Sequence, residues 1–264
     1  MNIVIIGSGN VATAMGIKMQ QAGHTIRQVY SRREDHAARL ASELDCRYTD
    51  RWGDIDPGGE LYVISLSDKA LETIGKDLSL PDKLVVHTAG AVPTEVLLSV
   101  SRHCGVLYPL QSLRRESRPF PEIPLLVDAV LPEDRDLLLS FARSISPRVE
   151  EAGNEERLKM HVAAVLVNNF PNYLYVLAED FCRQEGLDFS FLLPIIQETA
   201  HRLAHVLPPD AQTGPAVRGD ASTVKRHLKI LDKYQDISEL YSLFSIQIEA
   251  FGRKQREGKQ GDHK

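Results

Sequence analysis

A short glycine-rich segment near the start of the sequence contains the residue types that bind a dinucleotide. It has the pattern GxGxxA and follows a continuous apolar run over residues 3–6, as a turn between a buried strand and a helix would. Gly7 permits a tight turn, Gly9 lets the backbone approach a pyrophosphate, and the small Ala12 lets the helix pack close to the strand. Amides at the start of the helix then face the phosphates. The alternative is a turn whose glycines serve backbone geometry alone. The predicted turn consists of Gly7, Ser8, Gly9, Asn10, Val11 and Ala12.

The end of the second predicted strand indicates which dinucleotide is bound. NAD-specific domains usually place a carboxylate there to bond the ribose hydroxyls. This chain has Ser31, Arg32 and Arg33 instead. Since a guanidinium matches a phosphate by bidentate hydrogen bonding, these residues predict a site for the 2′-phosphate of NADP(H). The alternative is a solvated basic pair that opens a helix, where the helix dipole disfavours cations.

Three further segments follow predicted strands at the carboxyl edge of the sheet, where ligands of open α/β sheets bind. They are residues 65–68, 87–90 and 108–112, with the sequences SLSD, HTAG and YPLQS. His87 is a candidate for orienting substrate or cofactor, although a lone histidine is more often structural. From the first two segments we predict as cofactor-binding residues Ser65, Leu66, His87, Thr88, Ala89 and Gly90.

Polar residues within the helical second half are the candidates for catalysis. His161 and Asn168 are seven residues apart and share one face of a helix that is otherwise apolar, and Asn169 follows them. If buried, such groups need partners, which a substrate carbonyl or ordinary interhelical hydrogen bonds would supply. Further along, Asp220 is a plausible N-cap for the next helix. Arg218 beside it would pair with Asp220 or with a substrate carboxylate.

The predicted strands and helices that position these residues follow one another in an order that indicates two domains. In the first half, short apolar strands alternate with helical stretches, which is typical of a parallel, doubly wound sheet, the Rossmann fold. Weaker strands are predicted near residues 124–127 and 147–150. From residue 155 on we expect only helices, the first over residues 155–184 with a kink at Pro171. We therefore predict a dinucleotide-binding domain over residues 1–152, a helical domain over 153–254, and a polar, disordered tail over 255–264.

Composition excludes several other classes. The net charge of −5 provides no basic surface for nucleic acid. The longest apolar stretch, residues 162–167, is far too short to span a bilayer, and no basic segment precedes the first apolar run as in a secretory signal. Cys46, Cys104 and Cys182 are isolated, without metal-ligand spacing, and indicate a reducing compartment. We expect a cytoplasmic protein without a metal site.

The sequence resembles a family with an N-terminal Rossmann-like domain and a C-terminal helical domain of unknown function. That family is related to pyrroline-5-carboxylate reductase, to ketopantoate reductases and to the deazaflavin-dependent NADP oxidoreductases. The resemblance covers nearly the whole chain. Its motifs are the GSGNVA turn, the HTAG and YPLQS segments, the helix KMHVAAVLVNNF, and TGPAVRGD before the third helix.

The resemblance implies a fold in which the helical domain is of the 6-phosphogluconate dehydrogenase C-terminal type. It implies a homodimer formed through that domain, with the active site in the cleft between domains. Asn169 is similar to an asparagine in the family's long helix. In the family a small residue precedes that asparagine, whereas in this chain Asn168 precedes it. The related dehydrogenases often carry a catalytic lysine four residues before an asparagine, a spacing that Lys159 lacks. His161 is therefore the better candidate for the proton donor.

Together these features predict an NADPH-dependent reductase of a small carbonyl or imine, a keto acid or a pyrroline-like compound. The catalytic candidates are His161, Asn168, Asn169 and Arg218. One alternative is a non-catalytic NADP-binding sensor or regulatory protein. Another is a methyltransferase, which the arginines at the end of the second strand argue against, because an adenosine ribose would favour a carboxylate there.

Overall fold

The computed structural model describes residues 1–261 and divides into two compact units, Met1–Pro171 and Asn172–Lys264. The predicted domain boundary, between residues 152 and 153, lies at the end of the sheet, before the division between these two units. The first unit includes the last strand, which ends at Glu151, and the beginning of the long helix after it. Each unit is described separately below.

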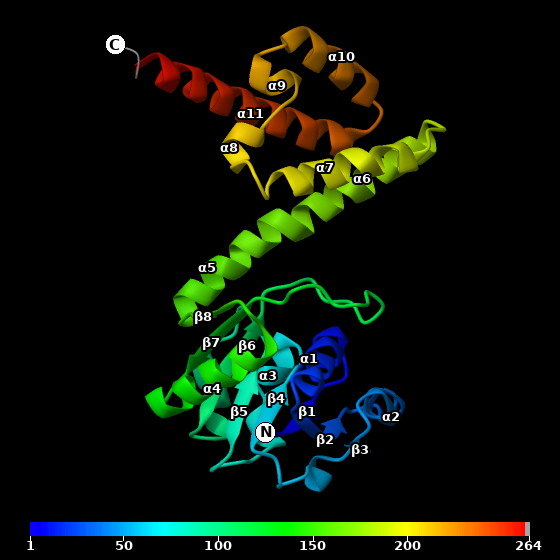
Figure 1. Cartoon of the computed structure of the whole chain (residues 1–264). Coiled ribbons are helices and arrows are strands. Elements are labelled where there is room, and N and C mark those ends of the chain that lie inside the picture. Colours follow the sequence, from blue (N-terminus) through cyan, green and yellow to red (C-terminus); the bar gives the residue numbers. More distant parts are fainter. Residues whose placement is uncertain (262–264) are drawn as a thin grey trace. The chain divides into compact units, whose positions relative to one another are not determined.

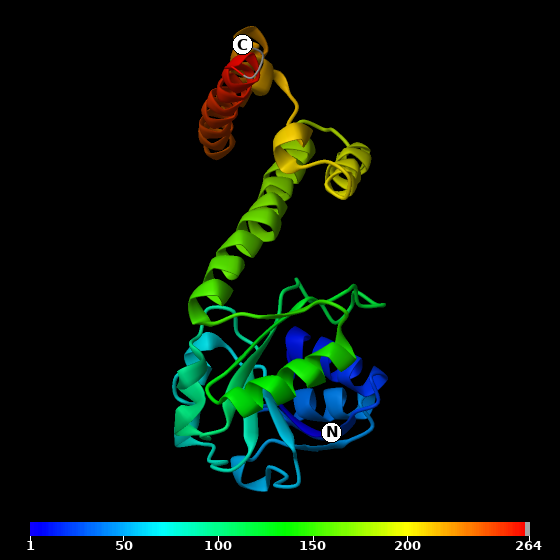
Figure 2. The ribbon, with the colours of Figure 1, turned by 60° about the vertical axis from the view of Figure 1, so that its left-hand side comes forward.

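An eight-stranded sheet forms the centre of the first unit (Figures 1 and 2). Its order is β3-β2-β1-β4-β5-β6-β7-β8, so the chain winds outward from β1 in both directions. The strands are β1 (Asn2–Ile6), β2 (Thr25–Tyr30), β3 (Arg47–Thr49), β4 (Leu61–Ile64), β5 (Leu84–His87), β6 (Cys104–Pro109), β7 (Leu125–Ala129) and β8 (Val149–Glu151). The predicted doubly wound fold is thus confirmed, and its switch point lies between β1 and β4.

Helices cover both faces of this sheet. The first face packs α1 (Asn10–Gln21), α2 (Glu34–Glu43) and α4 (Pro132–Ile145) against alternate strand residues such as Ile3 and Ile5. The second face packs α3 (Asp68–Leu71), η2 (Ile74–Lys76) and η3 (Thr94–Ser99) against the intervening residues, such as Val4 and Ile6. A short helical turn, η1 (Trp52–Asp54), precedes β4. Because both faces are buried, the central strands are continuous apolar runs rather than alternating ones.

The sheet is mostly parallel, as predicted, and one pair of strands near its edge differs. Residues 124–127 and 147–150 do contribute strands, but β7 pairs with β6 in antiparallel register. The reason is that residues 110–124 contain no helix to carry the chain back across the sheet, and a parallel pair needs such a crossover. The chain returns instead as a long loop beside the carboxyl ends of β1 and β6.

The long predicted helix is present in three consecutive segments. They are α5 (Asn154–Ala164), the wide π-helical turn η4 (Val165–Asn169) and α6 (Phe170–Gln184). In η4 the amide of Phe170 donates to the carbonyl of Val165, five residues back. This wide turn lies immediately before Pro171, whose ring would clash with the carbonyl four residues earlier in a regular helix. The proline is therefore accommodated by a wide turn.

The second unit contains helices only, apart from their connections, within the residues described. They are α6 from Asn172 on, then η5 (Phe189–Leu192), α7 (Leu193–Arg202), α8 (Pro208–Ala211), α9 (Pro215–Arg218), α10 (Ala221–Leu231) and α11 (Gln235–Gly261). The predicted disordered tail is corrected over residues 255–261, which continue α11 because lysine, arginine, glutamine and glutamate are good helix formers. Residues 262–264 lie outside the described part. Between residues 1 and 261, no helix has both the length and the apolar character needed to cross a membrane.

Candidate functional site

The glycine turn lies at the switch point of the sheet. Gly7 has φ +122°, which favours glycine, and a Cβ atom there would lie 2.3 Å from the carbonyl oxygen of Ser65 at the end of β4. Gly9 is different: its φ of −78° suits any residue, and apart from its chain neighbours no described residue would lie within 4 Å of a Cβ atom there. Neither backbone conformation nor packing within the chain therefore requires glycine at position 9. Open space of this kind fits the close approach of a dinucleotide backbone.

The first turn of α1 offers unpaired amide groups beside this space. Thr13 donates to the carbonyl of Gly9, but among the described residues no backbone acceptor pairs with the amides of positions 8–12. The N-cap, Gly9, has no side chain that could accept from them. Such a helix end attracts an anion, because the amides and the helix dipole both present positive charge.

A cavity of about 260 Å³ joins most of the predicted cofactor residues. The predicted residues Asn10, Val11 and Ala12 do not line it: Ala12 is buried against the sheet and Val11 packs on the same core. Thr88 is nearby, donating from its hydroxyl to Ser65 Oγ at 3.3 Å. The lining residues are Gly7, Ser8, Gly9, Ser31, Arg32, Arg33, His36, Ser65, Leu66 and Ser67.

The basic residues after β2 differ in their contacts. Arg33 forms a bidentate ion pair with Asp35, at 3.1 and 2.7 Å, and hydrogen bonding from Arg33 lowers the pKa of that carboxyl. Arg32 is exposed and pairs with no carboxylate in the described part of the chain. Ser31 accepts a hydrogen bond from Ser8 Oγ at 2.8 Å, which leaves its own hydroxyl proton free to donate. Arg32 and Ser31 are thus the groups most available to an anion.

His36 lines the same cavity and was not predicted. It lies three residues after Arg33 on the first turn of α2, so helical spacing from the arginine pair was the signal that could have identified it. A neighbouring cavity of about 500 Å³ also includes Arg32, and its wall contains Tyr30 stacked on Trp52 with ring centroids 4.0 Å apart. Flat aromatic walls beside an arginine suit a planar base.

His87 is fully buried, and both ring nitrogens are engaged. Nδ1 accepts from the amide of Ala89 at 3.2 Å, and Nε2 lies 3.3 Å from the carbonyl of Pro93, to which it donates as the protonated nitrogen. Burial, and secondarily the charge of Arg157, lower the pKa of His87 to about 4. A neutral ring in this setting shapes the HTAG turn after β5.

The HTAG turn brings Gly90 against two side chains from other elements. A Cβ atom on Gly90 would lie 2.7 Å from Cζ of Tyr108 and 2.9 Å from Nδ1 of His161. Tyr108 comes from β6 and His161 from α5, and Tyr108 Oη lies 3.0 Å from His161 Nδ1. Burial raises the pKa of Tyr108, and the cation of Arg157 partly offsets that effect. This hydroxyl–imidazole pair can hold and move a proton.

A buried arginine lies under this pair. Arg157 is 1% exposed; its Nη2 donates to the carbonyl of Val92 at 2.6 Å and to Asn154 Oδ1 at 2.9 Å. Its Nη1 lies 3.8 Å from Asp128 Oδ2, while Nε and Nη1 have no hydrogen-bond partner. Burial lowers the pKa of Arg157. Sequence reasoning missed both Arg157 and Tyr108; YPLQS was noted only for its place after a strand.

The other catalytic candidates lie elsewhere. Asn168 and Asn169 end the wide turn η4 and are exposed, so they do not need the partners that burial would require. Arg218 ends α9 in the second unit and is exposed. Asp220 caps α10 as predicted, accepting from the amide of Thr223 at 3.0 Å, and this bond lowers its pKa to about 2. Lys159 is exposed and pairs with Glu155 at 2.6 Å.

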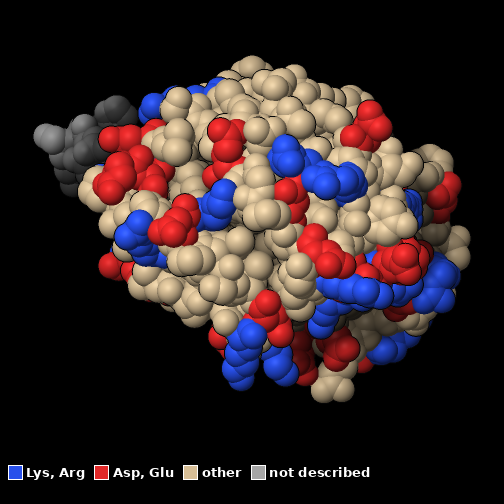
Figure 3. Space-filling view, turned by 90° about the horizontal axis from the view of Figure 1, so that it is seen from below, with Lys and Arg blue, Asp and Glu red and all other residues tan. Residues whose placement is uncertain are grey.

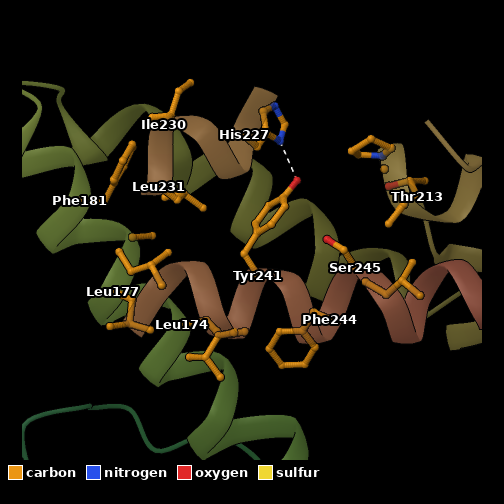
Figure 4. Close-up of a pocket in the computed structure, with 17 residues that line it drawn as sticks. Leu174, Leu177, Phe181, Thr213, His227, Ile230, Leu231, Tyr241, Phe244 and Ser245 are labelled. Atoms are coloured by element: carbon orange, nitrogen blue, oxygen red, sulfur yellow. Dashed lines mark hydrogen bonds between the residues drawn. The ribbon is translucent and has the colours of Figure 1, made fainter. Parts of the chain in front are cut away.

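The second unit has a cavity of its own, of about 570 Å³, between α6, α10 and α11 (Figure 4). Leu174, Leu177, Phe181 and Phe244 contribute apolar side chains to its walls. One polar pair is present, in which His227 Nδ1 lies 2.7 Å from the hydroxyl of Tyr241. None of the predicted site residues lines this cavity.

The charges on the face shown in Figure 3 are mixed. Lysine and arginine side chains are interspersed with aspartate and glutamate, and no large patch of one sign is visible there. That face offers no footprint for a polyanion.

Comparison with known proteins gives two adjacent family matches. The family described as NADP oxidoreductase coenzyme F420-dependent matches residues 2–90, and a domain of unknown function, DUF2520, matches residues 123–248. Comparison with functionally curated proteins gave no match.

Solved structures extend these matches over nearly the whole chain. A Bacteroides fragilis protein assigned as an NADP oxidoreductase is 36% identical, with a TM-score of 0.86, and the alignment covers 94% of this chain and 98% of that one. A Thermotoga maritima protein is 20% identical (TM-score 0.74; 96% and 99% covered). Pyrroline-5-carboxylate reductase from Streptococcus pyogenes is 16% identical (TM-score 0.60; 95% and 98% covered). The last two show a shared fold.

Proposed function

This chain belongs to the same family as the Bacteroides fragilis protein assigned as an NADP oxidoreductase, and we propose that it transfers a hydride from NADPH to a small carbonyl or imine. The observation that carries the proposal is the space at Gly9, which none of residues 1–261 fills and which lies beside unpaired helix amides. When bound, the dinucleotide supplies the hydride. The protein's own residues must bind it, orient the acceptor and provide a proton.

Ser31 and Arg32 support NADP(H) over NAD(H). Both line the cavity next to the glycine turn, and no carboxylate lines that cavity to bond a ribose diol. Arg33 is held by Asp35, so we assign the main contact with the 2′-phosphate to Arg32, with His36 beside it. The Tyr30–Trp52 stack is the proposed wall for the adenine.

His161 and Tyr108 are the proposed source of the proton. Their hydrogen bond lies against Gly90, at the carboxyl edge of β5 and β6, where ligands of such sheets bind. A proton leaves this pair for the carbonyl oxygen or imine nitrogen as the hydride reaches the adjoining carbon, and solvent then restores it. Asn168, Asn169 and Arg218 remain proposed substrate contacts, Arg218 for a substrate carboxylate.

The second unit supports the proposal of a homodimer. Among its described residues only Cys182 and Leu231 are buried apolar side chains, whereas many large ones are exposed, with Phe191 at 81% and Ile246 at 64%. A helical unit without its own core needs an apolar cover. We propose that the helices of a second copy provide it, and the apolar walls around the cavity of Figure 4 suit such an occupant.

The unpaired thiols of Cys46, Cys104 and Cys182 fit a reducing compartment, and we propose the cytoplasm.

The test of function is NADPH oxidation against a panel of 2-keto acids and cyclic imines, with NADH in parallel. Turnover with one class and NADPH would identify the acceptor. NADPH binding without turnover of any member would instead favour a sensor. The only tryptophan, Trp52, lies at the proposed adenine site, so its fluorescence reports binding independently of turnover.

A further inference from the structure

The loop between β6 and β7 carries a cation to the glycine turn. Arg115 Nη2 donates to the carbonyl oxygen of Ser8 at 2.8 Å, and the backbone amide of Arg115 lies 3.4 Å from Asn10 Oδ1. More than a hundred residues separate these partners in the sequence. The loop is also held at a second point, where Arg118 pairs with Glu43 on α2 at 2.6 Å. The position of Arg115 beside the turn is therefore specified by several contacts.

This position is electrostatically unfavourable in the protein alone. Arg115 lies at the start of α1, where the unpaired amides of positions 8–12 already present positive charge. Arg118 has Glu43 as a counter-ion, but Arg115 pairs with no carboxylate within residues 1–261. A guanidinium and a helix N-terminus repel one another unless an anion lies between them. The arrangement thus points to an anion that both of them bind.

We propose that Arg115 binds the diphosphate of the dinucleotide, so that the loop of residues 110–124 lies as a strap beside the bound cofactor. This inference rests on the proposed cofactor. A diphosphate carries the charge that the site lacks, and a guanidinium bonds phosphate oxygens in a bidentate manner. One Nη2 proton remains on the Ser8 carbonyl, and the other donors of the guanidinium are available to the phosphates.

The structural alternative is that Arg115 only anchors the loop to the turn. Ligand fragments separate the two roles. NADP⁺ contains both the 2′-phosphate and the diphosphate, whereas 2′-AMP contains the adenosine and the 2′-phosphate alone. If Arg115 binds the diphosphate, its replacement must weaken the binding of NADP⁺ and leave the binding of 2′-AMP unchanged. If Arg115 only anchors the loop, its replacement would not separate the two compounds in this way.

The experiment measures dissociation constants for both compounds by Trp52 fluorescence or calorimetry in wild type, Arg115→Gln and Arg115→Lys. We expect Arg115→Gln to weaken the binding of NADP⁺ by about tenfold to a hundredfold, the range of a charge-assisted hydrogen bond, and to leave the binding of 2′-AMP unchanged. Arg115→Lys should recover part of the loss, because it restores the charge but not the bidentate geometry. Arg114→Gln is the matched control, since this neighbour is exposed and its side chain makes no hydrogen bond with described residues.

Two other outcomes are informative. If Arg115→Gln binds NADP⁺ within about twofold of wild type, or weakens both compounds equally, Arg115 is not a diphosphate ligand. If wild type binds neither NADP⁺ nor NADPH, the proposed cofactor and this inference fail together. Thermal unfolding of each variant shows whether the fold has been kept.

Discussion

Tyr108 and His161 lie 53 positions apart in the sequence, yet the hydroxyl of one is 3.0 Å from Nδ1 of the other. They meet because Gly90 has no side chain to separate them. Three elements therefore converge, the end of β6, the turn after β5 and the last turn of α5. The proton transfer that we propose for this pair would depend on groups that the sequence presents in three separate motifs.

Replacement of Gly90 should disrupt this pair. A Cβ atom would approach both Tyr108 and His161 to less than 3 Å, so Gly90→Ala should separate them and lower turnover by about tenfold or more. Gly153→Ala is the matched control, since its φ of −64° and the open space around it tolerate a methyl group. Turnover by the Gly90 variant equal to that of the control would contradict the role of the pair.

Removal of either polar group of the pair should slow chemistry without weakening the cofactor. Tyr108→Phe and His161→Ala should each lower kcat by about 10²-fold or more, the usual contribution of a positioned general acid, with unchanged affinity for NADPH. The measurement is steady-state kinetics with the acceptor found in the panel, together with Trp52 fluorescence. The double variant should lose little more than either single one, because the two groups act as a unit. Full additivity would indicate separate roles.

Arg32 and Arg33 should contribute unequally to cofactor choice. Arg32 has no acidic partner among the described residues and lines the cavity, whereas Arg33 is paired with Asp35. Arg32→Gln should therefore reduce the preference for NADPH over NADH by about tenfold, and Arg33→Gln by much less. The measurement is the affinity of each variant for NADPH and for NADH. An equal loss of preference in the two variants would count against the assignment of the 2′-phosphate to Arg32.

Protonation of His87 should make the first unit less stable in acid. Its pKa is about 4 in the folded protein, whereas an unfolded histidine has a pKa near 6.5, so the unfolded state binds more protons between these values. The free energy of unfolding should fall as the pH drops through this window, by about 3 kcal/mol for this group. Urea unfolding of wild type and His87→Gln at several pH values, followed by Trp52 fluorescence, measures the difference. An equally steep fall in the variant would exclude His87 as the cause.

A charge on the exposed apolar surface of the second unit should disrupt self-association. Wild type should have twice the chain mass in light scattering, and the double variant Phe191→Glu/Ile246→Glu should be monomeric, because charges would be buried in the interface. Gln197→Glu adds a charge at an exposed polar position of α7 and should remain dimeric. A monomeric wild type would contradict the proposal.

Local patterns in the sequence were sufficient for the sheet-and-helix alternation, the dinucleotide turn and the cap at Asp220. Each of these depends on neighbours a few residues apart: an apolar run ending in glycine, or a carboxylate beside a helix start. The direction of β7 was not predicted, because a strand has the same apolar pattern in either direction. The lack of a helix over residues 110–124 was the signal for it. The tail over residues 255–261 was misjudged since polar residues favour both disorder and a solvated helix.

The pairing of side chains across the molecule was decided only by the tertiary structure. Arg33 is identical in type to Arg32, but its guanidinium is held by Asp35; His87 is buried with both nitrogens engaged, whereas His161 meets a tyrosine hydroxyl. Arg115 reaches the glycine turn through a long loop, and none of the sequence motifs includes Arg115. The sequence by itself determined the glycine turn at which we propose that a dinucleotide binds, because that turn is part of one continuous strand–turn–helix. Which charges and protons surround it depended on contacts between distant segments, and those exist only once the sheet has assembled.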